Sequence, residues 1–282
     1  MRSKSGVRPT EAGRLLYKHA QVMLRQLDLA EADIRVDGAE VAGQVCIGLA
    51  PFTASTLAVP LLKVVRERYP GIVLQIHENI GGIMSELIMT GQLDLAFIHD
   101  PGERRGVEFE PVLSEDLFLV CTTSRLPANA GEESVEFKDV APMDLMMPRR
   151  INTVRQVVDL TFRRSGGEPN VIAELESIPT LALAVGADLG ATVLPWSVAS
   201  SIVQQSTDVV ARRVVSPTIQ VKVSMCTSQQ FPLSEPALAV RNILSELAYG
   251  YAETHSARGV RAMQPGPLRS ERDSPSSTTR KK

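Results

Sequence analysis

The sequence predicts an α/β protein in which a doubly wound sheet is built twice, once in each of two lobes. Three observations lead to this fold class. Strand-like and helix-like segments alternate from Gly43 to Asp100, and the alternation returns between Asp144 and Val215. Aromatic residues make up only 4% of the chain. A core of Val, Leu, Ile and Ala is typical of buried parallel strands covered by helices.

The first lobe follows a βαβαβ order, which indicates parallel strands with right-handed crossovers. Its predicted strands and helices, in chain order, are Gln44–Leu49, Thr53–Tyr69, Ile72–His77, Ile83–Met89 and Leu93–His99. Pro60 implies that the first helix starts late or bends in its first turns. A further strand, Leu117–Thr122, leads into a polar crossing at 123–133.

The second lobe repeats the alternation. Its predicted elements are Asp144–Met147, Thr153–Arg164, Val171–Leu175, Ile178–Ala187, Ala191–Leu194, Pro195–Ser201 and Val209–Val215. After Ser216-Pro217 the chain is expected to cross back and add the strand Gln220–Cys226 and the helix Glu235–Tyr249. The first lobe is therefore assigned to 43–122 and 218–251, and the second lobe to 123–217. The Pro- and Ser-rich segment 252–282 reads as a disordered tail.

An amphipathic helix precedes the lobes and begins after Thr10, which suits an N-cap. Apolar residues repeat along it at alternating intervals of four and three, as in a heptad seam. These residues are Leu16, Ala20, Met23, Leu27, Ala30 and Ile34. The segment 10–42 is either a long surface helix packed on its own domain or a linker and dimerisation helix. Its length of roughly 40 Å and its one-sided apolar face favour the second interpretation.

Charge is distributed unevenly along the chain, whose net charge is −2. The segment 254–282 has seven basic and two acidic residues, and 1–35 has seven basic and four acidic residues, so the central body carries −10. Any contact with nucleic acid therefore belongs to the ends. The basic ending Arg280-Lys281-Lys282 is either a solvated tail or a DNA-contacting arm.

Several function classes are excluded by what the sequence lacks. No stretch approaches the ~20 apolar residues of a membrane span, and the N-terminus has no apolar region typical of a secretory signal, so a cytoplasmic protein without a membrane partner is expected. The three cysteines are far apart and are expected to be reduced. His77-Glu78 lacks a second His at zinc-site spacing, and no nucleophile elbow, Walker A loop or dinucleotide-binding turn occurs. We therefore predict no enzyme, no metal site and no cofactor.

The clearest candidate for a ligand site is a hydroxyl-bearing turn between a strand and a helix in each lobe. Thr53 and Ser55 lie in such a turn in the first lobe, and Ser177 and Thr180 lie in the equivalent turn of the second lobe. Hydroxyl groups there either only cap the helix or also bind a small anion together with free N–H groups. We expect the two turns to face each other across a cleft.

Three further residues could take part in this cleft. Gly81 precedes a helix, so its turn either is merely glycine-rich or presents N–H groups to a ligand. His99 ends a strand on the side where ligands bind in open α/β sheets. Arg149 follows the first strand of the second lobe and could supply a positive charge, as could Arg150.

Five segments together resemble LysR-type transcriptional regulators. They are Ser5–Gly13, Gly43–Gly48, Glu67–Pro70, Gly91–Ala96 and Leu189–Pro195. The resemblance extends from about Lys4 to Tyr249. It implies a fold like a type 2 periplasmic-binding protein and assembly into homodimers or homotetramers. It also implies a small-molecule effector in the cleft between the lobes, and this effector could be an anion. By position, it places Thr53, Ser55, Gly81, His99, Arg149, Ser177, Thr180 and Trp196 in the cleft lining.

One departure from the family pattern concerns DNA. Family members carry a winged helix-turn-helix before the linker helix, whereas this sequence begins inside the wing, of which 1–9 would be a remnant. Arg2, Lys4 and Arg8 are the candidate phosphate contacts, without a base-reading helix. We expect specific DNA binding to be weak or absent in this chain. A misassigned start, a truncated gene and a subunit that pairs with intact partners are all compatible with this pattern.

The sequence thus predicts the effector-sensing and oligomerisation part of a transcriptional regulator. The alternative is a solute-binding protein of the same fold, which would need an export signal and no dimerisation helix. An enzyme on this fold would need an acid and a base paired in the cleft, and we identify none.

Overall fold

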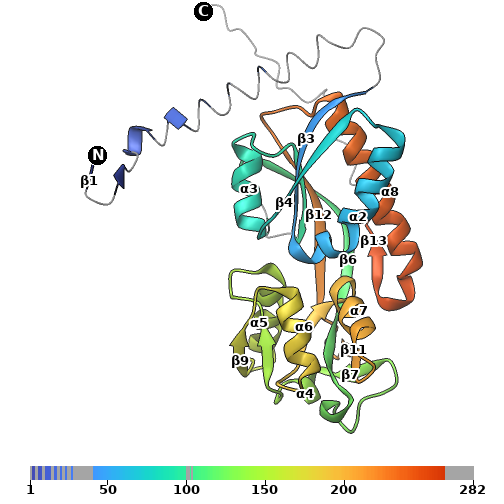
Figure 1. Ribbon diagram of the computed structural model, residues 1–282. Helices are drawn as coiled ribbons and strands as arrows, with labels where there is room; N and C mark the ends of the chain where they lie inside the picture. The colour runs from blue at the N-terminus through green and yellow to red at the C-terminus, as the bar shows by residue number, and fades with distance from the viewer. Residues whose placement is uncertain are drawn as a thin grey trace, which may run out of the picture.

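The computed structural model describes residues 2–3, 6–7, 10–13, 16–17, 20, 23, 27, 41–99, 102 and 104–263. Two α/β lobes lie end to end and are joined by long strands (Figure 1). The two-lobed fold predicted from the sequence is confirmed. No helix in the described part of the chain is long and apolar enough to cross a membrane.

Lobe I is built on a sheet with the strand order β4-β3-β5-β12-β6. Its elements are β3 (Gly43–Leu49), α2 (Pro51–Arg68), β4 (Ile72–Glu78), α3 (Gly81–Met89), β5 (Leu95–His99), β12 (Gln220–Ser228), α8 (Glu235–Thr254) and β13 (Val260–Ala262), together with the first part of β6 (Val107–Thr122). β3 pairs in parallel with β4 and β5, as the βαβαβ pattern predicts. β12 is antiparallel to both β5 and β6.

Helices cover both faces of the lobe I sheet. Leu57 and Leu61 of α2 share a core with Leu244 of α8 on one face, and Met84 of α3 packs on the other. Gly48 permits this close approach of α3, since a Cβ at that position would lie 2.6 Å from the Met84 sulfur. α2 starts at Pro51 and continues past Pro60, so the alternative of a late start is wrong.

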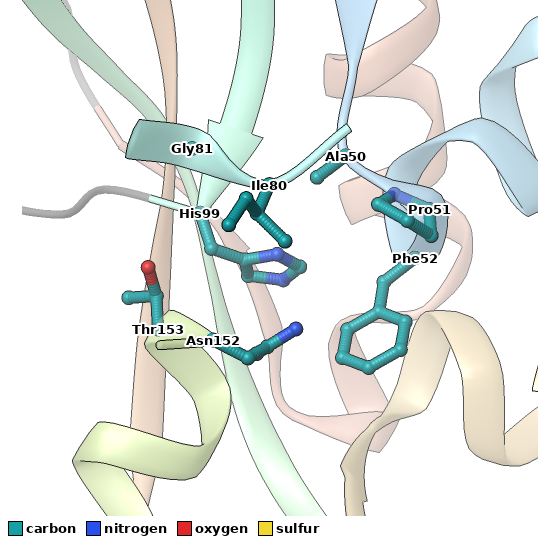
Figure 2. A pocket seen from close by; sticks show the side chains of 8 residues that line it. All are labelled: Ala50, Pro51, Phe52, Ile80, Gly81, His99, Asn152 and Thr153. Carbon is teal, nitrogen blue, oxygen red and sulfur yellow. The ribbon is translucent and has the colours of Figure 1, made fainter. Parts of the chain in front are cut away.

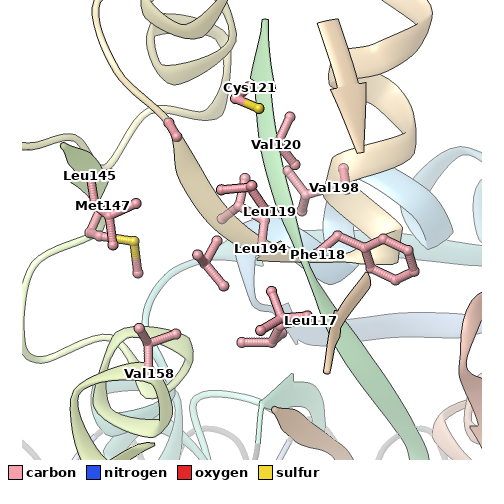
Figure 3. Packing of buried hydrophobic residues seen from close by; sticks show 14 of the residues in the cluster. Leu117, Phe118, Leu119, Val120, Cys121, Leu145, Met147, Val158, Leu194 and Val198 are labelled. Carbon is pink, nitrogen blue, oxygen red and sulfur yellow. The ribbon is translucent and has the colours of Figure 1, made fainter. Parts of the chain in front are cut away.

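β6 is the strand that joins the lobes. Its first half pairs with β12 and β13, and its second half pairs with β10 and β11. Leu117–Thr122 therefore lies in the core of lobe II, although the sequence assigned it to lobe I with a crossing at 123–133 (Figure 3). The chain changes lobe near Asp116 instead, because one extended strand can serve both sheets. The return crossing is near Ile219, whose carbonyl accepts the Leu117 N–H at 2.8 Å.

Lobe II surrounds the second half of β6. Its elements are β7 (Ser134–Glu136), α4 (Phe137–Val140), β8 (Leu145–Met147), α5 (Thr153–Arg164), β9 (Val171–Glu174), α6 (Ile178–Gly186), β10 (Thr192–Pro195), α7 (Trp196–Gln205) and β11 (Val209–Val215). β8 and β9 are parallel, whereas β10 and β11 run antiparallel to β6. Figure 3 shows Leu194 and Val198 packed beside β6, with Val158 of α5 nearby.

The C-terminal boundary predicted from the sequence is wrong. α8 continues to Thr254, and β13 follows it and pairs with β6. Ala252 and Val260 are buried, so the chain from 252 to 263 belongs to lobe I rather than to a disordered tail. The rest of the predicted tail, 264–282, lies outside the described residues.

Few of the predicted linker-helix residues are described. Positions 11–13, 16–17, 20, 23 and 27 are helical, and Leu16, Met23 and Leu27 are exposed. Ala30 and Ile34 lie outside the described residues. Near the N-terminus, Arg2–Ser3 pairs antiparallel with Gly6–Val7. The candidate DNA contacts Lys4 and Arg8 are also outside the described residues.

Candidate functional site

A pocket opens between the lobes where three helices begin. It is lined by Ala50, Pro51, Phe52, Ile80, Gly81, His99, Asn152 and Thr153 (Figure 2). These residues come from the starts of α2 and α3 and the end of β5 in lobe I, and from the start of α5 in lobe II. The carboxyl ends of parallel strands and the following helix N-termini are where ligands bind in open α/β folds.

The two lobe I helices that begin at the pocket, α2 and α3, start without a side-chain cap. Their N-cap residues are Ala50 and Ile80, whose side chains cannot accept a hydrogen bond. The first N–H groups of a helix have no partner inside the helix, so those of α2 and α3 are left for solvent or a ligand. In α2 these donors begin at Phe52, because Pro51 has no N–H group. α5 differs because the Asn152 side chain accepts the Val154 N–H at 2.9 Å.

His99 is the polar side chain of lobe I at the centre of this pocket. Its side chain is 5% exposed, and burial lowers its pKa to about 4, so the imidazole is neutral at physiological pH. Nε2 has no hydrogen-bond partner among the described residues. The ring packs edge-on against Phe52, with centroids 5.7 Å apart, and points into the pocket (Figure 2). A buried imidazole nitrogen without a partner is poised to bind a ligand.

The hydrogen-bond donors of this pocket come from backbone and from neutral side chains rather than from charged groups. None of its lining residues is a lysine, arginine, aspartate or glutamate. Helix N-termini carry roughly half a positive charge each, and their N–H groups are ready-made donors for an anion. Such a lining suits hydrogen-bond acceptors.

The predicted hydroxyl groups of lobe I stabilise the helix start. Thr53 donates to the carbonyls of Ala50 and Phe97, both at 2.9 Å, and is 3% exposed. Ser55 donates to the Phe52 carbonyl at 2.8 Å. Both hydroxyls are therefore engaged with backbone, and the ligand-facing groups of this turn are its N–H groups.

The predicted residues of lobe II lie outside this pocket. Ser177 caps α6, accepting from the Thr180 N–H at 3.4 Å and from the Thr180 hydroxyl at 3.0 Å. Arg149 is exposed and pairs with Glu176, with 3.0 Å between Nε and Oε1. Trp196 starts α7 and packs on Phe118 near the crossing strands, with ring centroids 5.1 Å apart. Of the eight predicted residues, the structure brings Gly81 and His99 together in the pocket.

Sequence reasoning missed two lobe II residues that line the pocket, Asn152 and Thr153. Asn152 precedes a predicted helix, and an Asn at this position is a standard start signal that could have identified it. Phe52 and Ile80 offered no comparable signal, because apolar residues at a helix start are also typical of simple packing. Within the described part of the chain, no three His, Cys, Asp or Glu side chains gather in a group that could hold a metal ion.

Comparison with known families identifies the domain. Residues 38–248 match the family model described as the LysR substrate binding domain. The chain belongs to the LysR family. The matched residues 38–248 include every residue that lines the pocket between the lobes.

Two curated relatives are similar over most of the chain. The nitrogen assimilation regulatory protein nac of Klebsiella aerogenes is 38% identical over 248 residues, which are 88% of this chain and 79% of the relative. The protein of the same name from Escherichia coli strain K12 is 37% identical over 245 residues, 86% of this chain and 78% of the relative. Gly48–Pro51, His77–Asn79 and Glu174–Ile178 also resemble the nitrogen assimilation control protein, and these relatives confirm that resemblance.

Solved structures share the fold. A full-length OxyR variant from Pseudomonas aeruginosa superposes with a TM-score of 0.67 at 20% identity, covering 88% of this chain and 78% of that one. The effector-binding domain of QuiR in complex with shikimate superposes with a TM-score of 0.64 at 15% identity, covering 76% of this chain and 99% of that one. The relatives named here are regulators, and neither the family model nor these matches supports the alternative of a solute-binding protein.

Proposed function

We propose that this chain is the sensing and oligomerisation part of a transcriptional regulator whose effector is a small anion bound between the lobes. The observation that carries the proposal is the pocket itself. The uncapped starts of α2 and α3 meet there with the buried Nε2 of His99, which has no partner among the described residues. Backbone donors and a neutral imidazole suit a carboxylate or an oxyanion.

The residues predicted in lobe II would join the ligand when the lobes shift. Arg149 forms an exposed ion pair with the Glu176 carboxylate, and a ligand carboxylate could replace Glu176 as its partner. Ser177 and Thr180 are exposed at the start of α6 and remain proposed effector contacts, as do Ser55 and Trp196. Thr53 is proposed to contribute its backbone N–H group, because its hydroxyl is bonded to backbone carbonyls. Binding that draws these groups together would change the angle between the lobes.

The names of two similar proteins support a proposal about the class of ligand. The nac proteins are named for nitrogen assimilation, and QuiR was solved with shikimate, a small hydroxylated carboxylate. We propose that this chain responds to a small metabolite of that kind, regulates transcription in the cytoplasm, and catalyses no reaction. Contact with DNA through Arg2, Lys4 and Arg8 is proposed as weak phosphate binding.

A thermal-shift screen followed by calorimetry tests the effector site. The probes are shikimate, succinate, glutamate, 2-oxoglutarate, sulfate and phosphate. A ligand at a hundred times its Kd stabilises the folded state by about 2.7 kcal/mol, which is easily measured. His99→Phe keeps an aromatic ring but removes Nε2, so it is expected to weaken binding about tenfold. His77→Phe, on an exposed position of β4, is the matched control.

Two results would count against the effector site. One is the absence of a thermal response to every probe. The other is equal loss of binding in the His99 and His77 variants, since that would place the ligand away from the pocket.

We also propose that the chain forms homodimers or homotetramers. Large exposed apolar side chains on the linker segment and on both lobes support this, because subunit interfaces bury such side chains. They include Leu16 (67% exposed), Met23 (62%), Val59 (60%), Val73 (64%) and Leu183 (74%). Light scattering is expected to give a dimer or tetramer that dissociates in Leu183→Glu, whereas Lys138→Glu, on the exposed side of α4, should keep the wild-type mass. A wild-type monomer would contradict the proposal.

A further inference from the structure

The chain after α8 forms a strap, residues 255–262, which lies beyond the 38–248 family match. It turns back at His255–Arg258 and runs along β6 as β13. We propose that this strap is a brace that fixes the angle between the two lobes. The proposal is independent of which ligand the pocket takes.

The strap is anchored firmly on lobe I. Val260 is fully buried, and β13 pairs with β6 through the register Val260↔Glu115. Gly259 makes the turn possible, because its φ is +73° and a Cβ there would lie 2.1 Å from Asp116 Oδ2. The Gly259 carbonyl also accepts the Asp116 N–H at 3.1 Å. Only glycine combines that backbone conformation with the space available.

Asp116 joins the strap to both crossing strands at the point where β6 changes lobe. Its carboxylate is 1% exposed and accepts two hydrogen bonds from Arg261 of the strap, at 2.8 and 3.1 Å. Gln220 of β12 donates to it at 2.7 Å, and Arg213 of β11 lies 3.6 Å away. A buried carboxylate held by a bidentate arginine is geometrically specific. Asp116 therefore fixes the strap, β6 and β12 relative to one another.

The strap also reaches lobe II. The Arg258 guanidinium lies 4.9 Å from the centre of the Trp196 ring at the start of α7. Its Nη1 is 3.9 Å from the exposed carboxylate of Glu133. From the other side, Arg213 of lobe II donates to the carbonyl of Ala257. Three contacts therefore span the two lobes from one short segment.

These contacts lie beside the axis about which the lobes would turn. β6 and β12 carry the chain between the lobes, so a change of angle occurs near Asp116. Any rotation that moves α7 away from the strap must break the Arg258–Trp196 stack. Loss of one cation–π contact shifts an equilibrium by about 2- to 30-fold, so removing it is expected to populate other lobe angles.

The lobe angle can be measured directly with two spin labels. Lys63→Cys in α2 and Lys138→Cys in α4 place one label on each lobe at exposed positions, while the three native cysteines are buried. The labelled full chain is mixed with excess unlabelled protein so that distances within one chain dominate. Pulsed dipolar spectroscopy is then recorded for the wild-type strap and for Arg258→Ala.

We expect Arg258→Ala to broaden the interlobe distance distribution and to add a second population. Arg258→Lys, which keeps the charge but not the planar stack, should lie between the two. The matched control is Arg68→Ala, because Arg68 is also half-exposed and pairs with Glu246 inside lobe I. It should leave the distribution unchanged.

Trp196 is the chain's single tryptophan, so its fluorescence reports whether the stack has been lost. The brace is overturned if tryptophan fluorescence changes in Arg258→Ala while the interlobe distances match those of the wild type. It is also overturned if Arg68→Ala broadens the distances equally. Neither result depends on an effector, so failure of the brace and failure of the proposed effector site are separate outcomes.

Discussion

The helices that begin at the pocket, α2 and α3 of lobe I and α5 of lobe II, differ in how their first N–H groups are satisfied. In lobe I, α2 and α3 begin after Ala50 and Ile80 and have no side-chain cap. In lobe II, α5 and α6 are capped by Asn152 and Ser177. A cap satisfies an N–H group that a ligand would otherwise bind. The difference assigns most of the backbone donors of the pocket to lobe I.

The largest effect that we expect is a loss of folding stability at low pH, caused by His99 in lobe I beside the uncapped starts of α2 and α3. Burial lowers its pKa from 6.5 to about 4, so the unfolded chain takes up a proton first as pH falls. The stability contributed by the neutral imidazole is therefore complete above pH 6.5 and is lost as pH falls towards 4. The expected loss from this residue is about 3 kcal/mol.

Urea unfolding at pH 7 and pH 4.5 measures this effect. His99→Gln should reduce the difference in unfolding free energy between the two pH values, and His77→Gln is the control for removing an exposed imidazole from the same lobe. Equal pH dependence in wild type and His99→Gln would show that His99 is not buried as a neutral group.

A smaller effect is expected at the start of α2. Thr53→Val removes a buried hydroxyl that donates to two carbonyls while keeping the side-chain shape. We expect a loss of about 1–2 kcal/mol in the free energy of unfolding, with little change in the binding of an anion. Unchanged stability combined with lost anion binding would instead make Thr53 a direct ligand contact.

The smallest changes in folding stability should come from the capped helices of lobe II, α5 and α6. Asn152→Ala and Ser177→Ala each remove an acceptor from a helix start, at a cost of about 1 kcal/mol. Chemical unfolding of the two variants checks this. Ser55→Ala serves as a comparison, because Ser55 donates to a carbonyl and caps no N–H group. A stabilised Ser177→Ala variant would contradict the role assigned to the lobe II caps.

Sequence patterns predicted most of the fold because strands and helices here have clear periodicity. The bounds of α5 and β11 match the predicted ones, Thr153–Arg164 and Val209–Val215. The first half of β6 was missed because its Ser114-Glu115-Asp116 run reads as polar. Those carboxylates are buried in the structure, since Glu115 accepts the Ser197 N–H and Asp116 binds Arg261. Partners so distant in sequence cannot be inferred from local pattern.

The pocket was only partly predictable for a related reason. Gly81 and His99 stood out because glycine and histidine have distinctive chemistry at strand and helix ends. The hydrogen-bond donors around them are backbone N–H groups. Every residue except proline has such a group, so these donors cannot be recognised from the residue types in the sequence. Thr53 was predicted as a ligand contact because of its hydroxyl, but that hydroxyl donates to a backbone carbonyl inside the turn.

The central claim is that uncapped helix starts in lobe I bind a small anion, and a cap introduced at Ile80 tests it most directly. Ile80→Asp places a carboxylate at the N-cap of α3 and inside the pocket lining. We predict that calorimetry with the anion panel shows saturable binding to wild type and to Ser234→Ala, which alters a cap on α8. Binding should be absent in Ile80→Asp, whose unfolding free energy should rise by about 1 kcal/mol. Wild-type affinity in Ile80→Asp would contradict the claim.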